Sequence, residues 1–205
     1  MINKYKEKLN KLKVEKDFLK KELKSKNSLL LENKKQFENL IKAQNIIQEV
    51  AQKTQNEIKF FIIDIVNLAL NSIPFENPPD SFEMEFVTRR NQTECDLFYL
   101  KEDHRLNPLL SEGGGVLSIT SFALLLACWS LQNKKNNTII FDEPFKDVND
   151  PGNKLNLMFC IGEMIKKVSE LLNIQIIIVG SNGNFNEIAD KIFEVKKENK
   201  TSKIT

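Results

Sequence analysis

The sequence predicts an α/β protein in which a long N-terminal coiled-coil helix leads into a lobe that contains a β-hairpin. The helix is predicted by an apolar heptad pattern that continues to about residue 68, with no Gly or Pro before Pro74. The hairpin is predicted by the alternation of apolar and polar residues within 82–87. Further along, short apolar runs alternate with helical patterns, which is typical of parallel strands in an α/β layer.

Residues 1–58 are expected to form the coiled-coil helix. Apolar residues recur at alternating steps of three and four from Ile2 to Leu68. Polar residues interrupt this seam at Lys16, Lys26, Asn33, Gln44 and Thr54. At 1.5 Å per residue the rod would be roughly 100 Å long. Because the apolar residues of such a seam are exposed to water in a single helix, the pattern predicts a partner helix.

Residues 59–196 are expected to form one lobe, entered by the apolar end of the helix around 60–66. Ser72-Ile73-Pro74 ends the helix, because proline cannot continue it. The expected elements that follow are a hairpin of 82–87 and 96–100, a loop at 104–108, a buried helix at 118–131, a buried strand at 138–141, an amphipathic helix at 153–172 and a buried strand at 174–179. The Asn- and Lys-rich residues 197–205 are expected to be a disordered tail.

Charge and cysteine usage narrow the class of protein. The 205 residues carry 30 Lys and Arg against 28 Asp and Glu, so nucleic-acid affinity would need a local patch. Residues 1–26 hold ten lysines and four acidic residues, which fits either a solvated helix face or an arm that touches DNA or RNA. Cys95, Cys128 and Cys160 are scattered, form no zinc motif with the single His, and are expected to be buried thiols.

The compartment is expected to be the cytoplasm. The three scattered cysteines fit a reducing environment, since proteins that are held together by disulfides have cysteines that can be matched in pairs. No apolar run is long enough to span a bilayer, so no membrane is expected as a partner. The start of the chain also lacks the apolar stretch of a signal peptide.

Two adjacent carboxylates follow one of the predicted buried strands. Asp142 and Glu143 come directly after the apolar run of 138–141. Ligands of α/β sheets bind at the carboxyl ends of the parallel strands. There Asp142 can hold Mg²⁺ through water, and Glu143 can polarise a water that attacks a γ-phosphate. Any strand can end in Asp-Glu, so the pair alone does not establish a site.

Three glycines precede the predicted buried helix. Gly113, Gly114 and Gly115 would let the backbone approach an anion closely. The N terminus of the following helix would add unpaired N–H groups and a partial positive charge. An ordinary flexible loop has the same composition, so this motif too is ambiguous by itself.

The order of these motifs resembles the C-terminal lobe of ABC-type ATPase heads, especially the SMC-like repair ATPases such as SbcC and its eukaryotic counterparts. Glycine turn, apolar helix, apolar strand, Asp-Glu-Pro, acidic loop, helix and apolar strand follow one another in that family order. Residues 86–97 and 121–124 are similar to a group of phage-encoded members, which would place the protein in the host cytoplasm. The resemblance covers about residues 40–195 and implies ATP and Mg²⁺ as cofactors.

The resemblance also implies a role for each matching position. The three glycines would be the signature motif and would contact the γ-phosphate of ATP bound on an opposing head. Asp142 and Glu143 would be the Walker B pair, with Asp142 serving Mg²⁺ and Glu143 acting as the catalytic base. Asp147 and Asn149, in the D-loop, would bridge the two nucleotide sites.

The sequence departs from the family pattern at three places. An ungapped alignment puts Gly113 at the signature serine, and Ser111 would need a two-residue shift to take that role. Ser181 or Asn182 stands where the family has its switch histidine, and either can hydrogen-bond a phosphate oxygen without supplying imidazole chemistry. Finally, no Walker A loop of the type G-x-x-x-x-G-K-[ST] occurs, so no nucleotide should bind tightly to this chain alone.

Three functions fit this combination. The first is half of a split SMC-like ATPase for DNA repair or recombination, completed by a separate P-loop chain with its own coiled-coil arm; DNA and a nuclease subunit are the further partners implied. The second is a catalytically degenerate module that forms a homodimer through its seam and binds nucleic acid. The third is a fragment split by an intron or frameshift, which predicts the same missing partner. Because several strands lack neighbours, the lobe alone is expected to be marginally stable.

Overall fold

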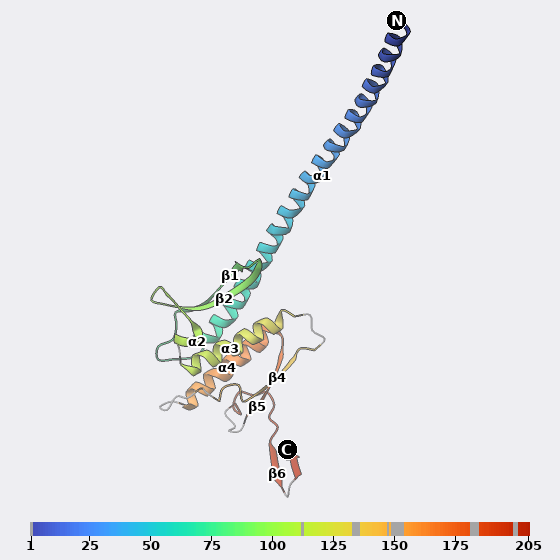
Figure 1. The fold of residues 1–205 in the computed structure, drawn as a ribbon. Coiled ribbons are helices and arrows are strands. Elements are labelled where there is room, and N and C mark those ends of the chain that lie inside the picture. The colour runs from blue at the N-terminus through green and yellow to red at the C-terminus, as the bar shows by residue number, and fades with distance from the viewer. Residues whose placement is uncertain are drawn as a thin grey trace. The chain divides into compact units, whose positions relative to one another are not determined.

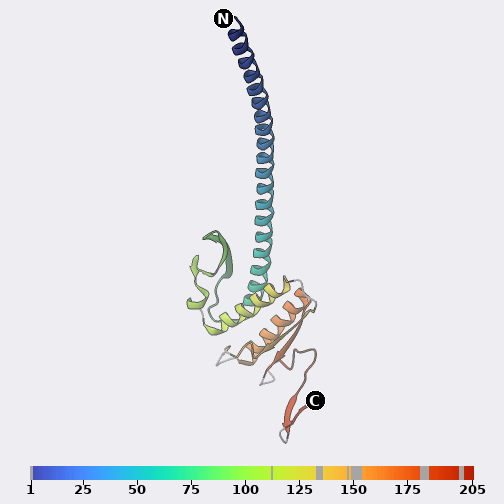
Figure 2. The same ribbon diagram turned by 45° about the vertical axis from the view of Figure 1, so that its right-hand side comes forward.

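The computed structural model describes residues 2–111, 113–132, 136–146, 148, 154–180, 185–198 and 201–205. The chain divides into two compact units, Met1–Thr54 and Gln55–Thr205. Figures 1 and 2 show the elements of both units. No helix among the described ranges is long and apolar enough to cross a membrane.

The first unit is the N-terminal part of one continuous helix, α1 (Ile2–Asn71). Its seam residues are exposed along the whole unit, as the heptad pattern requires for a helix without a partner; Leu12 is 56% exposed and Leu40 67% exposed. The predicted long helix is therefore confirmed. It ends where Ser72 donates a hydrogen bond from its hydroxyl to the carbonyl of Leu68, two residues before Pro74.

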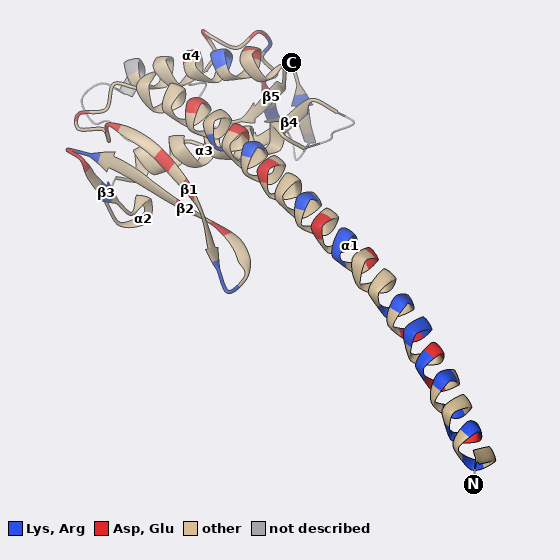
Figure 3. Ribbon diagram, turned by 90° about the horizontal axis from the view of Figure 1, so that it is seen from above, with Lys and Arg blue, Asp and Glu red and all other residues tan. Residues whose placement is uncertain are grey.

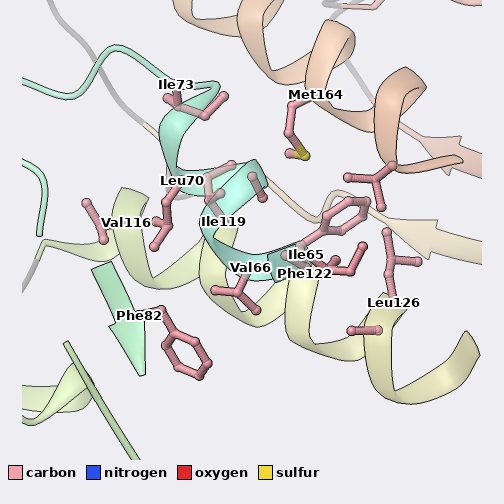
Figure 4. Packing of buried hydrophobic residues seen from close by; sticks show 14 of the residues in the cluster. Ile65, Val66, Leu70, Ile73, Phe82, Val116, Ile119, Phe122, Leu126 and Met164 are labelled. Atoms are coloured by element: carbon pink, nitrogen blue, oxygen red, sulfur yellow. The ribbon is translucent and has the colours of Figure 1, made fainter. Parts of the chain in front are cut away.

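The core of the second unit lies between the end of α1 and two further helices, α3 (Gly114–Ser130) and α4 (Lys154–Leu172). Buried side chains of α1 face those of α3, with Met164 of α4 beside them (Figure 4). The buried side chains of these three helices include Ile62, Ile65, Val66, Leu70, Val116, Ile119, Phe122, Leu126, Ile161, Met164 and Val168. Since burying one such side chain contributes about 1.5–3 kcal/mol, this helix layer dominates the stability of the lobe.

A three-stranded antiparallel sheet packs on this core. It consists of β1 (Ser81–Arg89), β2 (Gln92–Lys101) and β3 (His104–Leu106), and the buried pair Phe82 and Tyr99 lies opposite in register. The hairpin was predicted, but β3 was expected to be a loop. The chain instead turns back at Glu102-Asp103, where both residues have positive φ (49° and 63°), as two-residue hairpin turns require.

Asn67 of α1 joins the helix to the edge of β1. Its side-chain amide accepts a hydrogen bond from the backbone N–H of Phe82 at 2.7 Å and donates one to the carbonyl of Phe82 at 3.2 Å. The amide therefore substitutes for a neighbouring strand at this point. Phe82 is fully buried, so its backbone groups have little access to water.

Replacing Asn67 with Ala is expected to lower the free energy of unfolding by about 2–3 kcal/mol, because both backbone groups of Phe82 lose their partner. Urea denaturation followed by circular dichroism measures this change. Asn45→Ala, on the exposed part of α1, is the matched control and should change stability by less than about 0.5 kcal/mol. Equal effects of the two substitutions would contradict the role of the Asn67 amide.

A second sheet carries the predicted carboxylates. It consists of β4 (Thr138–Asp142) and β5 (Gln175–Val179), which pair in parallel with Thr138 opposite Gln175 and Asp142 opposite Val179. The predicted parallel pairing is confirmed, and α4 is the crossover between the strands. One face of this sheet packs on the core through Ile139, Phe141, Ile176 and Ile178.

The other face of the β4–β5 sheet is open, which corrects the expectation of fully buried strands. Ile140 is 66%, Ile177 43% and Val179 53% exposed. The two strands alternate between exposed and half-buried residues, because only one layer of described elements covers them. Within the described ranges the sheet has no third strand.

The C-terminal residues form a small hairpin of β6 (Val195–Glu198) and β7 (Thr201–Ile204). Val195 lies opposite Ile204, and Glu194 and Thr205 exchange backbone hydrogen bonds of 2.9 Å. The sequence predicted a disordered tail over 197–205. The structure instead pairs β6 with β7, and the composition of the tail gives no indication of this pairing.

Candidate functional site

Asp142 and Glu143 lie at the carboxyl edge of the β4–β5 sheet. Asp142 is the last residue of β4, and the backbone N–H of Glu143 donates to the carbonyl of Val179 at 2.9 Å, which extends the ladder by one bond. Both carboxylates are exposed. Gly180 follows β5 directly, and no atom lies within 4 Å of where its Cβ would be. Two exposed carboxylates therefore lie at the strand ends, the usual ligand position of α/β sheets.

Glu143 has a left-handed backbone conformation, with φ of 44°. This conformation costs a residue other than Gly roughly 1–2 kcal/mol. The chain turns sharply after the strand, because the N–H of Lys146 donates to the carbonyl of Glu143 at 3.3 Å. Such strain persists only where the surrounding structure imposes it, and it is common at functional sites.

Phe145 anchors this turn in the core. It is 4% exposed, and its ring lies 4.9 Å from that of Phe122 and 6.1 Å from that of Phe185. Phe122 also lies 4.7 Å from Phe141 of β4. A single side chain of α3 therefore contacts the strand and the turn on either side of the carboxylates, which fixes their position relative to α3.

The glycine turn opens α3. Gly113 is the N-cap residue in an extended conformation, and no side chain caps the helix there. A Cβ at Gly113 would meet nothing within 4 Å, whereas one at Gly115 would lie 3.5 Å from Phe75 and 3.9 Å from Val148. The first N–H groups of a helix have no intrahelical acceptor, so this uncapped end fits an anion such as a phosphate.

Tyr99 connects the hairpin to the same helix. Its hydroxyl donates to the Thr120 hydroxyl at 2.6 Å, and both side chains are buried. The glycine turn is thus carried on a helix that is held from the hairpin side by this bond. On the other side Phe122 holds the helix to β4.

No protein-family model and no curated protein matches the chain. Solved structures of SMC proteins do match. An Smc head domain with a coiled coil and joint from Pyrococcus yayanosii aligns with a TM-score of 0.61 and 18% identity, over 90% of this chain and 33% of that one. An Smc head bound to the C-winged helix domain of ScpA aligns with a TM-score of 0.57 and 15% identity, over 77% and 44%.

A third match comes from work on ATP-driven dimerisation and DNA-stimulated activation of SMC ATPases. It has a TM-score of 0.53 and 16% identity, and it covers 77% of this chain and 87% of that one. These matches decide the fold. The chain has the fold of an SMC ATPase head with its coiled coil. It spans less than half the length of the two Smc heads above, so it corresponds to a part of such a head.

Ser111 lies outside the glycine turn of this SMC-like lobe. It ends the short helix α2 (Pro108–Ser111), and its hydroxyl donates to the carbonyl of Asn107 at 2.7 Å. The hydroxyl is therefore engaged within its own helical turn. Its predicted shift into the signature position stays a prediction.

Four predicted site residues of the SMC-like lobe lie outside the described residues: Asp147, Asn149, Ser181 and Asn182. Their predicted contacts with nucleotide remain predictions. In the described ranges, no group of three or more His, Cys, Asp or Glu side chains is arranged to hold a metal ion. The Asp142–Glu143 pair nevertheless fits Mg²⁺, since this ion commonly takes one or two carboxylates and completes its shell with water and phosphate oxygens.

The outer face of the hairpin holds an ion-pair cluster that the sequence did not reveal. The Arg89 guanidinium donates two bonds to the Asp96 carboxylate, at 2.8 and 2.6 Å, and one to Glu94 at 3.1 Å. The hydrogen bond from Arg89 lowers the pKa of Asp96, and the same bonds raise the pKa of Arg89. Arg89 is thus committed to neighbouring strand residues.

The cysteines of the SMC-like lobe are less buried than expected. Cys95 and Cys128 are exposed, and Cys160 is half-buried. Partial desolvation is the main cause that raises the pKa of both Cys95 and Cys128, which keeps these thiols protonated near neutral pH. The expectation of three buried thiols is wrong for these two positions, because each lies on an outward-facing part of its strand or helix.

Proposed function

We propose that this chain is the signature-motif and Walker B half of an SMC-like ATPase head, completed by a Walker A lobe on another polypeptide. The observation that carries the proposal is the open β4–β5 sheet, which ends in Asp142 and Glu143. The resemblance of the motifs assigns the assembled head to DNA repair or recombination, with DNA and a nuclease subunit as further partners.

The open face of the β4–β5 sheet supports the presence of a second chain, because the two strands are parallel. Parallel sheets occur almost always with both faces covered, whereas the exposed face here presents Ile140, Ile177 and Val179 to water. A sheet of only two strands is also marginal by itself in water. A lobe that adds strands or covers this face would bury the apolar side chains and bring its phosphate-binding loop to the strand ends.

Each described site residue has one role in this proposal. Asp142 would hold Mg²⁺, and Glu143 would accept the proton of the attacking water. The backbone N–H groups at Gly113, Gly114 and Gly115 would bind the γ-phosphate of ATP held by an opposing head. Mg²⁺, when bound, neutralises charge that develops on the phosphate oxygens.

The test is association with a P-loop protein from a neighbouring reading frame, followed by nucleotide titration. The chain alone should not bind ATP tightly, and the purified complex should. Ile140→Lys, on the open sheet face, should prevent association, whereas Leu171→Lys, an exposed position of α4, should not. Tight ATP binding by the chain alone would overturn the split-site proposal.

A catalytically degenerate module is the second candidate, and one observation favours it. The only histidine, His104, lies on β3 of the hairpin and is exposed, so it does not follow β5, where the family has its switch histidine. A complex that pairs and binds DNA without measurable ATP turnover would support this candidate over the first.

A further inference from the structure

The N-terminal part of α1 is strongly basic. Residues 2–26, here named the basic arm segment, are helical throughout and exposed. They contain ten lysines and four acidic residues. Figure 3 shows positive side chains, coloured blue, crowded along this part of α1, and in this segment all of them are lysines.

An apolar stripe runs along the same segment. Leu12, Leu19 and Leu23 are 56%, 55% and 66% exposed. They border one open depression on the helix surface together with Lys16 and with the flanking residues Glu15 and Lys20. Lys16 therefore lies inside the stripe, and any helix that buries these leucines must also accommodate its ammonium group.

The two flanks of the stripe differ in charge. Lys6, Lys13 and Lys20 follow one another at intervals of seven on one flank. The other flank carries Lys8, Glu15 and Glu22 at the same spacing. In the described part of the segment, the structure shows one ion pair, between Lys26 and Glu22 at 3.0 Å. Among the described residues, Lys6, Lys13 and Lys20 form no ion pair, although Asp17 lies within one helical turn of Lys13 and Lys20, so their charge is available to a partner.

A second copy of this chain complements the segment poorly. A parallel, in-register copy would set Lys16 against Lys16 and Lys26 against Lys26 inside the seam, and on its flanks one attractive pair, Glu15 with Lys20, would be offset by the repulsive pair of Lys8 with Lys13. An antiparallel copy centred on residue 28 would set Lys16 across from Leu40 and Lys26 across from Leu30, again without a carboxylate. Nucleic acid would pair with the lysines and leave the leucine stripe exposed to water.

We propose that the basic arm segment pairs with an acidic helix of a different polypeptide. That helix would bury the leucine stripe, place a carboxylate opposite Lys16, and present Asp or Glu to the flank of Lys6, Lys13 and Lys20. The proposal rests on the proposed function only in assigning this helix to the arm of the P-loop chain. It adds the charge of that arm and excludes homodimer pairing through this segment.

The probes are two synthetic helical peptides of four heptads, used with the full chain. Both carry Leu at their seam positions; the acidic peptide has Glu on its flanks and opposite Lys16, and the basic peptide has Lys there. Fluorescence anisotropy should show binding of the acidic peptide, and circular dichroism should show its helix content rise. Equal binding of the basic peptide would overturn the proposal.

Two triple variants with equal charge change separate the stripe from general electrostatics. Lys6→Glu/Lys13→Glu/Lys20→Glu alters the flank, and Lys4→Glu/Lys11→Glu/Lys21→Glu alters positions away from the seam. The flank variant should weaken peptide binding at least about tenfold more than the off-seam variant, because three attractive contacts become repulsive. Equal losses would overturn the proposal, as would a homodimer through the arm that the acidic peptide does not displace.

Duplex DNA is the remaining probe. If DNA binds the wild-type chain more tightly than the acidic peptide does and competes with it, the segment is a nucleic-acid arm and the proposal is wrong. Because no readout involves ATP, failure here leaves the split ATPase proposal standing. Tight ATP binding by the chain alone would overturn only the latter.

Discussion

Replacing Glu143 with Gln is expected to lower ATP turnover of the completed head by at least about 100-fold, since loss of a general base typically costs 10²–10⁴ in rate. Gln has nearly the same shape and can still orient a water molecule, but it cannot accept the proton. Phosphate release measures the turnover. ATP-dependent pairing of two heads, measured by sedimentation, should persist in the variant because the substitution leaves the phosphate contacts proposed for the glycine turn unchanged.

The backbone of Glu143 provides an independent check. Because φ is 44°, Glu143→Gly should raise the free energy of unfolding by about 0.5–1 kcal/mol, once the entropy of glycine is offset. Glu143→Gln should leave stability unchanged. Glu170→Gln, on the exposed side of α4, is the control for turnover. Normal turnover of Glu143→Gln would remove Glu143 from its proposed role.

The largest effect on stability is expected from Phe122→Ala, which should lower the free energy of unfolding by about 3–5 kcal/mol. Phe122 is 4% exposed and contacts the rings of Phe141 and Phe145. Its truncation leaves a cavity between α3 and the strand that carries the carboxylates. Urea denaturation of the purified lobe-containing chain measures the loss.

Leu125→Ala is the matched control for Phe122→Ala. Leu125 lies on the same helix but is 47% exposed, so its truncation should cost less than about 1 kcal/mol. If both variants unfold at similar urea concentrations, the aromatic cluster does not stabilise the lobe as described. If Phe122→Ala proves too unstable to purify, Phe122→Leu should show an intermediate loss.

The elements with strong periodicity could be predicted from the sequence. The heptad seam of α1 and the apolar runs of β4 and β5 are local patterns, and the structure forms the predicted helix and strands at these positions. The strand β3 was missed because the turn before it uses Glu102 and Asp103, which lack the Gly or Asn signal of two-residue turns. Arg90-Asn91 makes a similar turn, and there the alternating strands revealed the hairpin.

Burial and side-chain contacts between elements could not be predicted in the same way. The run of 174–179 looks like a buried strand whether or not a second layer covers it, so the exposure of Ile177 depends on elements far along the chain. The hydrogen bonds between the Asn67 amide and the backbone of Phe82, and the ion pairs of Arg89, form only because the fold brings these elements side by side. These contacts join residues on different elements, so no local sequence pattern indicates them.

The open face of the β4–β5 sheet has a consequence for how the protein is made in a cell. Under the split-head proposal, a chain synthesised without the P-loop chain presents Ile140, Ile177 and the edges of β4 and β5, which are unpaired among the described residues, to any extended polypeptide nearby. Chaperones and proteases act on such surfaces. Under that proposal, production of this chain should be coupled to that of the P-loop chain, so that balanced translation, and not the intrinsic stability of the lobe, sets how much of it accumulates.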